Sequence, residues 1–272
     1  MSKVYALASQ HDPLLRDDRD GIATLTLNRP AARNALSLAL IEALAEALAA
    51  IAADRSVRAV VIAASGPVFS AGHDLKELTA RRADADKGRD FFRRTFGECA
   101  AMMQAIVHLP QPVIACVQGM ATAAGCQLAA SCDLVVASEA AEFATPGVNI
   151  GFFCSAPMVA LSRKVPSNQA MEMLLTGEPI SAKRARKIGL VNRIAKAGEE
   201  RAEALKLAGV IASKSAYVQK IGKAAFYRQR ELGLADAYGY ALDVAVDNML
   251  ARDAAEGIGA FVEKRKPKWE DR

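Results

Sequence analysis

Two short segments combine residue types that can stabilise a developing negative charge. In each, a strand-like run leads through small residues and a glycine into a helical pattern, at Ala71-Gly72-His73-Asp74 and at Ala124-Gly125-Cys126-Gln127. The first backbone N–H groups of a helix have no intrahelical partner, so they point outward and attract anions. If the two junctions face one another, they would form an oxyanion hole that polarises a thioester carbonyl and stabilises an enolate. By spacing alone, an ordinary strand-to-helix turn of an α/β protein is the commoner explanation.

The elements around these junctions follow an α/β order. Apolar or alternating runs rich in β-forming residues predict strands at 21–28, 58–65, 113–120 and 133–139. Helical spacing of apolar residues predicts one helix after the N-cap residue Ser37, as far as 54, and another over about 91–107. The polar segment 84–89 is expected to be a loop. Strands that alternate with helices in this way predict a largely parallel sheet.

The pattern changes close to residue 198. From Glu199 to Lys264 only helical patterns occur, with breaks near Lys214, Gly233 and Arg252. We therefore expect residues 1–198 to form an α/β core and residues 199–272 to form a C-terminal helical region.

Composition and charge exclude several classes of protein. Of the 272 residues, 52% are hydrophobic and 24% charged, which is typical of a globular chain rather than a disordered one. Much of the net charge of +5 lies in EKRKPKWEDR at 263–272, which we expect to be a solvated face. Because basic residues are not interleaved with aromatic ones, we expect no nucleic-acid partner.

The cysteines and the N-terminus bear on location. The five cysteines lie in apolar surroundings and form no C-x-x-C or metal-ligand spacing, so we expect reduced, buried thiols, no metal site and a cytoplasmic protein. The N-terminus shows no apolar block of a signal peptide, and no apolar run reaches the ~20 residues of a membrane span. The first dozen residues are expected to be a loose extension.

Three motifs together resemble the enoyl-CoA hydratase/isomerase (crotonase) superfamily. They are FSAGHDLKEL at 69–78, QGMATAAGCQLAASCDLVVAS at 118–138 and EFATPGVNIG at 142–151. NRPAARNALS at 28–37 and AFVEKRKPKW at 260–269 extend the resemblance over most of the chain. It implies a spiral of ββα units whose C-terminal helices form a homotrimer or a dimer of trimers. It also implies a coenzyme A thioester as substrate or ligand, with no permanently bound cofactor.

Four segments resemble one subgroup of this superfamily more than the mitochondrial hydratase. They are ATAAGCQLAASCD at 121–133, FATPGVNIGFFCS at 143–155, LLTGEPISA at 174–182 and KRKPKW at 264–269.

The resemblance also implies a role for particular residues. His73 and Ala124 would supply the two N–H groups of the oxyanion hole. The residues along bound coenzyme A would be Arg33, Ala35, Ala71, His73, Asp74, Leu75 and Lys76. Phe261 and Lys264 would approach the nucleotide bound by a neighbouring subunit.

The chain departs from the superfamily at two positions. Where the hydratases carry their two acid–base glutamates, this sequence has Gln127 and Gly147. Neither residue can take up or release a proton near neutral pH. General acid–base catalysis is worth ~10²–10⁴-fold, so hydration of a 2-enoyl-CoA is expected to be weak or absent. The alternatives are a non-catalytic acyl-CoA-binding or regulatory protein of lipid metabolism, and a thioester hydrolase or isomerase that uses another residue.

Other residues near these positions leave the chemistry open. Cys154, beside Phe152 in the expected acyl pocket, is either an inert structural thiol or a nucleophile, which would require a lowered pKa. The imidazole of His73 either points away from the site or takes part in catalysis. Glu142 and Asp133 are either strand-end residues or displaced acids.

Overall fold

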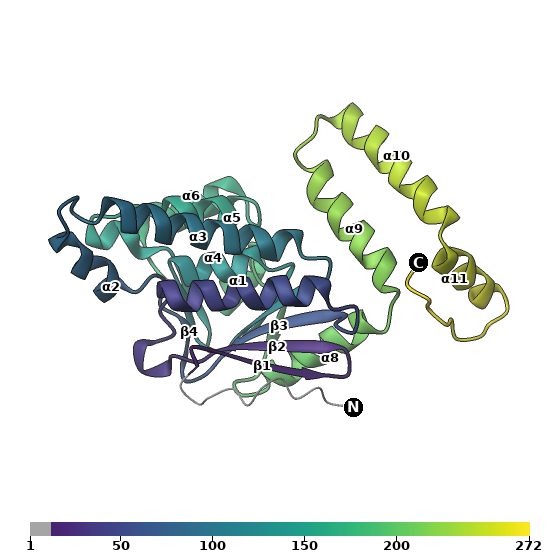
Figure 1. Cartoon of the computed structure of the whole chain (residues 1–272), viewed down its shortest axis with the longest axis horizontal. Coiled ribbons are helices and arrows are strands. Elements are labelled where there is room, and N and C mark those ends of the chain that lie inside the picture. Colours follow the sequence, from purple (N-terminus) through teal and green to yellow (C-terminus); the bar gives the residue numbers. More distant parts are fainter. Residues whose placement is uncertain (1–11) are drawn as a thin grey trace.

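The computed structural model describes residues 12–272, which form two β-sheets covered by helices (Figure 1). The larger sheet has the strand order β1-β2-β3-β5-β7-β10. Its strands are β1 (Leu14–Arg19), β2 (Ile22–Leu27), β3 (Ala59–Ala64), β5 (Val113–Val117), β7 (Leu134–Ser138) and β10 (Arg193–Ala195). β1 and β2 are antiparallel, and the strands from β2 to β10 pair in parallel. The predicted α/β class with a largely parallel sheet is confirmed.

Helices cover both faces of this sheet, as a parallel sheet requires. On one face α1 (Leu38–Ala53) and α3 (Arg89–His108) pack into the main hydrophobic core. Ser37 caps α1 by accepting a hydrogen bond from the backbone N–H of Leu40. On the other face lies α8 (Glu200–Ala212), which packs against β3, β5 and β7 through Ala204, Leu207 and Ala208.

The smaller sheet gives the fold its repeat. It has the order β4-β6-β8-β9, with β4 (Val68–Ser70), β6 (Met120–Thr122), β8 (Glu142–Ala144) and β9 (Ile180–Ser181). Three times the chain runs from the larger sheet into the smaller one: β3 to β4, β5 to β6, and β7 to β8. The pairs lead into α3, α4 (Ala124–Ser131) and α5 (Ser155–Ser162), respectively. The expected ββα units are therefore present.

Shorter elements connect these units. They are the 3₁₀ helices η1 (Pro30–Ala32), η2 (Arg81–Ala83) and η3 (Pro146–Ile150), and the helices α2 (Leu75–Ala80), α6 (Ser167–Thr176) and α7 (Ala182–Lys187).

Some boundaries differ from the predictions. The single strand predicted for 113–120 is two strands in different sheets, because the chain turns at Gly119. A Cβ atom there would lie 2.0 Å from the backbone oxygen of Pro67, so only glycine fits. The loop predicted for 84–89 ends one residue early, since α3 begins at Arg89. Strand β1 was not predicted, and the loose extension predicted for the first dozen residues lies, except for Asp12, outside the described residues.

The predicted helices after Glu199 are confirmed, and three of them form an arm that extends from the core (Figure 1). We call α9 (Ala216–Gln229), α10 (Leu234–Leu250) and α11 (Arg252–Val262) the arm. Every residue of α9 and α10 is at least partly exposed in this single chain. The exposed large apolar residues of the arm are Phe226, Leu234, Tyr238, Leu242, Val246, Met249, Leu250, Ile258, Phe261 and Val262.

The basic tail at 263–272 is exposed, but it is not free. The indole Nε1 of Trp269 donates to the backbone oxygen of Ser213 (2.9 Å), and Arg58 pairs with Asp271 (2.7 Å). The buried carboxylate of Asp253 accepts hydrogen bonds from the backbone N–H groups of Glu270 and Asp271 (2.7 and 3.0 Å). The tail is therefore a strap between α11 and the junction of α8 with α9. It is also solvated as predicted, since every one of residues 263–272 except the partly buried Trp269 is exposed.

Candidate functional site

The structure brings the two strand-to-helix junctions together. Gly72 has a positive φ of 84°, and a Cβ atom there would lie 2.9 Å from the Cβ of Ala123 and 3.2 Å from the backbone nitrogen of Ala124. Glycine therefore allows the first junction to touch the second at the start of α4. Within residues 12–272, the backbone N–H groups of His73 and Ala124 donate a hydrogen bond to no acceptor. Two unpaired donors thus lie on adjoining turns.

A buried asparagine positions the first junction. Asn34 is fully buried, and its Nδ2 donates to the backbone oxygens of Ser65 and Val68, both at 2.8 Å. Its Oδ1 accepts from the backbone N–H of Arg29 (2.8 Å). The sequence predictions missed this residue. The sequence feature that could have indicated it is an asparagine near a turn. Asparagine tolerates the left-handed backbone conformation (φ 50°) that Asn34 adopts.

Asp74 fixes the helix that follows this junction. Its side chain caps α2 by accepting from the backbone N–H groups of Lys76 and Glu77, and it pairs with Arg29 at 3.0 Å. Burial raises the pKa of Asp74, but the hydrogen bond from Arg29 and the capping bonds outweigh it and leave the pKa below its usual value. Asp74 is therefore an ionised structural group.

The second junction is held in a strained conformation. Ala123 has φ 51° and ψ −119°, a region that residues with a Cβ rarely adopt. Its N–H donates to the backbone oxygen of Ala144 (2.9 Å). At Gly125 a Cβ atom would lie 2.3 Å from the backbone oxygen of Ser70, so α4 packs directly against β4. The position of the Ala124 N–H is thus set by backbone contacts on two sides.

Gln127 lies one turn into α4 and faces a cavity. Its side chain is 5% exposed, and its backbone N–H donates to Ala123. The buried Oε1 atom accepts no hydrogen bond from any described residue. Leaving a buried polar atom unpaired costs about 1–3 kcal/mol, which a bound ligand or water would recover.

Gly147 lies in η3, where no side chain fits. A Cβ atom there would lie 2.0 Å from the backbone oxygen of Phe152 and 3.0 Å from the Sγ of Cys154. Phe152 also donates its N–H to the Gly147 oxygen (2.9 Å), which closes the turn. The backbone therefore leaves no space for an acidic side chain at position 147.

The imidazole of His73 packs into a row of aromatic rings. It contacts Phe96 edge-on at 5.0 Å, and Phe96 stacks on Phe152 at 6.0 Å. Burial lowers the pKa of His73, with the Leu36 backbone acting in the opposite direction. Its buried Nδ1 has no hydrogen-bond partner in the described part of the chain. The ring is therefore neutral at neutral pH and retains an unused polar atom.

Cys154 is a thiol rather than a thiolate. Burial raises its pKa, and the opposing effect of the Gly147 backbone N–H is smaller. The other cysteines are buried as well, and burial raises the pKa of each to about 12: Cys99, Cys116, Cys126 and Cys132. A raised pKa does not favour nucleophilic attack.

The residues expected along coenzyme A form two groups. Arg33 and Ala71 adjoin, since the Ala71 N–H donates to the Arg33 oxygen (3.0 Å), and the exposed residues Leu75 and Lys76 follow on α2. Ala35 lies in the same segment as Arg33 and is nearly buried. Phe261, 84% exposed, and Lys264 belong to the other end of the molecule, where α11 lies far from α2 (Figure 1). One protomer does not bring the two groups together.

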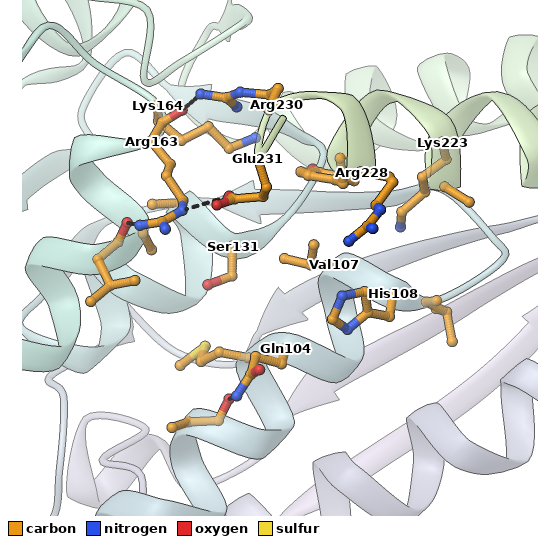
Figure 2. A pocket seen from close by; sticks show the side chains of 18 of the residues that line it. Gln104, Val107, His108, Ser131, Arg163, Lys164, Lys223, Arg228, Arg230 and Glu231 are labelled. Atoms are coloured by element: carbon orange, nitrogen blue, oxygen red, sulfur yellow. Dashed lines mark hydrogen bonds and ion pairs between the residues drawn. The ribbon is translucent and has the colours of Figure 1, made fainter. Parts of the chain in front are cut away.

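Figure 2 shows the lining of a cavity of about 850 Å³. Gln127 is one of the residues that line it. Helices α3, α4, α5 and α9 form its walls, and Gln104, His108, Ser131, Arg163, Lys164 and Arg228 are among the lining residues. No sequence pattern indicated that α9, some 90 residues after α4, lines this cavity.

Asp133 holds α9 against the core. Its carboxylate accepts from the backbone N–H of Val113 (2.7 Å), from Lys223 (2.7 Å) and from Tyr227 (2.9 Å). Both lysine and tyrosine belong to α9. Asp133 is thus occupied by structural contacts, and Glu142, at the start of β8, is exposed.

Fold and sequence agree on the class of protein. The sequence profile of the enoyl-CoA hydratase/isomerase family matches residues 17–272. The chain belongs to this family, and its ββα spiral is the crotonase fold seen in solved structures of enoyl-CoA hydratases. One of them, an enoyl-CoA hydratase of Mycobacterium smegmatis, is 50% identical, with a TM-score of 0.89 over 94% of this chain and 98% of that one.

The subgroup that the four segments resemble is that of enoyl-CoA hydratase domain-containing protein 3, and this similarity is confirmed. The mouse protein of that name, described as mitochondrial, is 48% identical over 96% of this chain and 86% of its own length. The crystal structure of the human protein is 47% identical, with a TM-score of 0.90 over 94% of this chain and all of that one.

No helix within residues 12–272 is both long and apolar enough to cross a membrane. Nor does any group of three or more His, Cys, Asp or Glu side chains there have the arrangement of a metal site.

Proposed function

We propose that the protein binds coenzyme A thioesters with the thioester oxygen between the backbone N–H groups of His73 and Ala124. The observation that carries this proposal is the contact between the two junctions, where Gly72 approaches the Ala124 nitrogen. Preorganised backbone donors in a water-excluding site stabilise an oxyanion or enolate strongly. Because the donors belong to the backbone, they do not depend on the residues that differ from the hydratases.

The same proposal includes weak or absent hydration of 2-enoyl-CoA. Gln127 and Gly147 occupy the positions that the resemblance assigns to the two glutamates. The amide of Gln127 can orient a water molecule or a carbonyl but cannot transfer a proton. Gly147 contributes no functional group. The neutral imidazole of His73 is the nearest titratable side chain along the chain to the proposed oxyanion donors.

Coenzyme A itself would lie along Arg33, Ala35, Ala71 and the start of α2. Asp74, Leu75 and Lys76 belong to that helix start. Phe261 and Lys264 would reach it only from a neighbouring subunit, which requires an oligomer. The exposed apolar side chains of the arm support a homotrimer or a dimer of trimers, because a monomer would leave this surface in water. A cytoplasmic location stays a prediction, since the mouse and human relatives are named as mitochondrial proteins.

The test combines binding with catalysis. Isothermal titration with crotonyl-CoA is expected to give a micromolar dissociation constant, while loss of absorbance of the conjugated thioester stays close to the rate without protein. Absence of binding to any acyl-CoA would refute the proposal. Rapid hydration by the unaltered protein would show that another group transfers the proton, and His73→Gln would then be examined first.

A non-catalytic acyl-CoA-binding protein and a thioester hydrolase remain the two alternatives. Release of free coenzyme A thiol from an acyl-CoA, lost in Cys154→Ser, would identify the hydrolase. The raised pKa of Cys154 weighs against that outcome. Binding without any turnover would identify the non-catalytic protein.

A further inference from the structure

The cavity beside Gln127 lies in line with an acyl chain bound at the proposed oxyanion hole. Gln127 is three residues and Ser131 seven residues beyond Ala124 on the same helix. With a rise of about 1.5 Å per residue, they lie roughly 4.5 and 10 Å from Ala124 along the axis of α4. Both line the cavity. A medium-length acyl chain that follows α4 would therefore have its far end in the cavity.

The walls of this cavity carry an excess of positive charge. Six cationic residues line it, namely Arg163, Lys164, Lys220, Lys223, Arg228 and Arg230, against one acidic residue, Glu231. Two of the cations have acidic partners: Lys223 pairs with Asp133 (2.7 Å) behind the wall, and Arg163 with Glu231 (3.6 Å).

Four cations of the lining have no acidic partner. Among residues 12–272, no carboxylate lies within 4.0 Å of the charged groups of Lys164, Lys220, Arg228 or Arg230. Lys164 donates only to the backbone oxygens of Cys132 and Asp133. Arg230 donates to the backbone oxygen of Arg163 (2.8 Å). In Figure 2 the side chain of Arg228 points from α9 toward Val107 and His108 of α3.

The charges are held by a fixed wall. Asp133 ties α9 to the core through Lys223 and Tyr227, and Lys223 also donates to the backbone oxygens of Ile106 and Gln111 (3.0 and 3.1 Å). Burial is the largest influence on Lys164 and lowers its pKa. An anion in the cavity would favour the charged form of this lysine.

The polar and apolar parts of the lining match a chain with a charged end. Met103, Val107 and Ala160 offer apolar surface for methylene groups. Gln127 supplies a buried oxygen that lacks a protein partner, which marks the wall as a ligand-contacting one. An acyl chain that ended in a methyl group would leave the four cations without an anion. A carboxylate at that end would accept charge-assisted hydrogen bonds.

We propose that this cavity binds the distal carboxylate of a dicarboxylic acyl-CoA, a coenzyme A thioester of a medium-length dicarboxylic acid. Arg228 and Lys220 are the expected contacts, since each is free of protein partners in the described residues. The inference rests on the proposed function, because it places the thioester end at His73 and Ala124.

The experiment compares ligands that differ only at the far end. Octanedioyl-CoA, its distal methyl ester and octanoyl-CoA are titrated calorimetrically into the full chain. The free carboxylate is expected to bind at least about tenfold more tightly than the ester, as a charge-assisted contact implies. The ratio of the affinity for the free carboxylate to the affinity for the ester should fall as salt is raised from about 0.05 to about 0.5 M. Screening weakens the attraction between the carboxylate and the cationic side chains.

Variants of the two expected contact residues test whether the carboxylate binds in this cavity. Arg228→Gln and Lys220→Gln are each expected to reduce the ratio of the two affinities by roughly threefold or more, and the double variant to bring it close to one. Lys183→Gln, at an exposed position of α7 outside the cavity, is the matched control and should leave the ratio unchanged. Both cavity residues lack described side-chain partners, so the variants are expected to fold, which circular dichroism would verify.

The possible outcomes separate the two proposals. If none of the three ligands binds, the proposed function fails, and this inference fails with it. If all three bind equally well, acyl-CoA binding stands and the carboxylate site is overturned. A preference for the carboxylate that survives in the double variant would equally overturn the assignment to this cavity.

Discussion

Gln127 on α4 and Gly147 in η3 stand at the two positions expected to carry acids, yet their surroundings differ. Gln127 has a full-length side chain that faces a cavity, and its Oε1 is unpaired among the described residues. Gly147 has no space even for a methyl group, because the Phe152 oxygen occupies it. The first position could accept a carboxylate with one atom exchanged, whereas the second could do so only after the backbone moves. Neither position carries an acid, but only the position of Gln127 has space for one.

The largest expected effect is at Gly147. Gly147→Ala should destabilise the protein by about 3 kcal/mol or more, since its Cβ meets backbone rather than a flexible side chain. Gly147→Glu should cost at least as much. Urea unfolding measures both. Gly209→Ala, on α8 with no atom within 4 Å of the new Cβ, is the control and should be neutral or slightly stabilising. Normal stability of Gly147→Ala would show that position 147, like position 127, has space for a side chain.

Asp133 holds α9, one wall of the cavity, in place. Asp133→Asn should destabilise the protein by about 2–3 kcal/mol, because it leaves Lys223, 8% exposed, without its counter-charge. Arg272→Gln breaks an exposed pair with Glu270 and should cost at most about 0.5 kcal/mol. Chemical denaturation of the two variants side by side makes the comparison. Equal, small effects would mean that α9 is held by other contacts.

Restoring an acid at the open position is a gain-of-function test. Gln127→Glu should fold normally and raise the rate of crotonyl-CoA hydration by about tenfold, less than a pair of acids would give, because one proton carrier is still missing. Gln127→Met keeps the length without polarity and should show no gain. Absorbance of the conjugated thioester follows the reaction. A rate no higher than that of the methionine variant would show that an acid at this position alone has no effect.

The smallest expected effect concerns His73. Burial lowers its pKa below the usual 6.5, so the unfolded chain takes up this proton first as the pH falls. Stability should therefore be unaffected by His73 above about pH 7 and should decline as the pH drops through about 6.5. His73→Gln should decline less between pH 7.5 and pH 5.5 in thermal unfolding. An equal decline in His73→Gln and in the unaltered protein would contradict this prediction.

Much of the fold could be predicted from local sequence patterns. Helix α1 has a capping serine and regular apolar spacing, and the breaks predicted near Gly233 and Arg252 fall where α10 and α11 begin. Both strand-to-helix junctions were recognisable because glycines and small residues mark them. The structure adds that they touch, which the spacing could not establish.

The remaining features depend on contacts between distant segments. The turn at Gly119 exists because Pro67, some fifty residues earlier, lies against it. The role of Asp133 depends on Lys223, ninety residues later. Nothing in the motif around Gly147 indicates that Phe152 closes over it. Such contacts arise from tertiary packing, which a pattern of neighbouring residues does not encode.

The strap at 263–272 has a consequence for how the arm can move. Trp269 and Asp271 tie the strap to Ser213 and Arg58, next to the start of α9. At its other side, the Asp253 carboxylate of α11 accepts hydrogen bonds from the strap backbone. The strap therefore closes a ring with α9, α10 and α11, and ring closure reduces the conformational freedom of the segment that it encloses. The arm is thus expected to swing as one body, hinged next to α8, rather than as three separate helices.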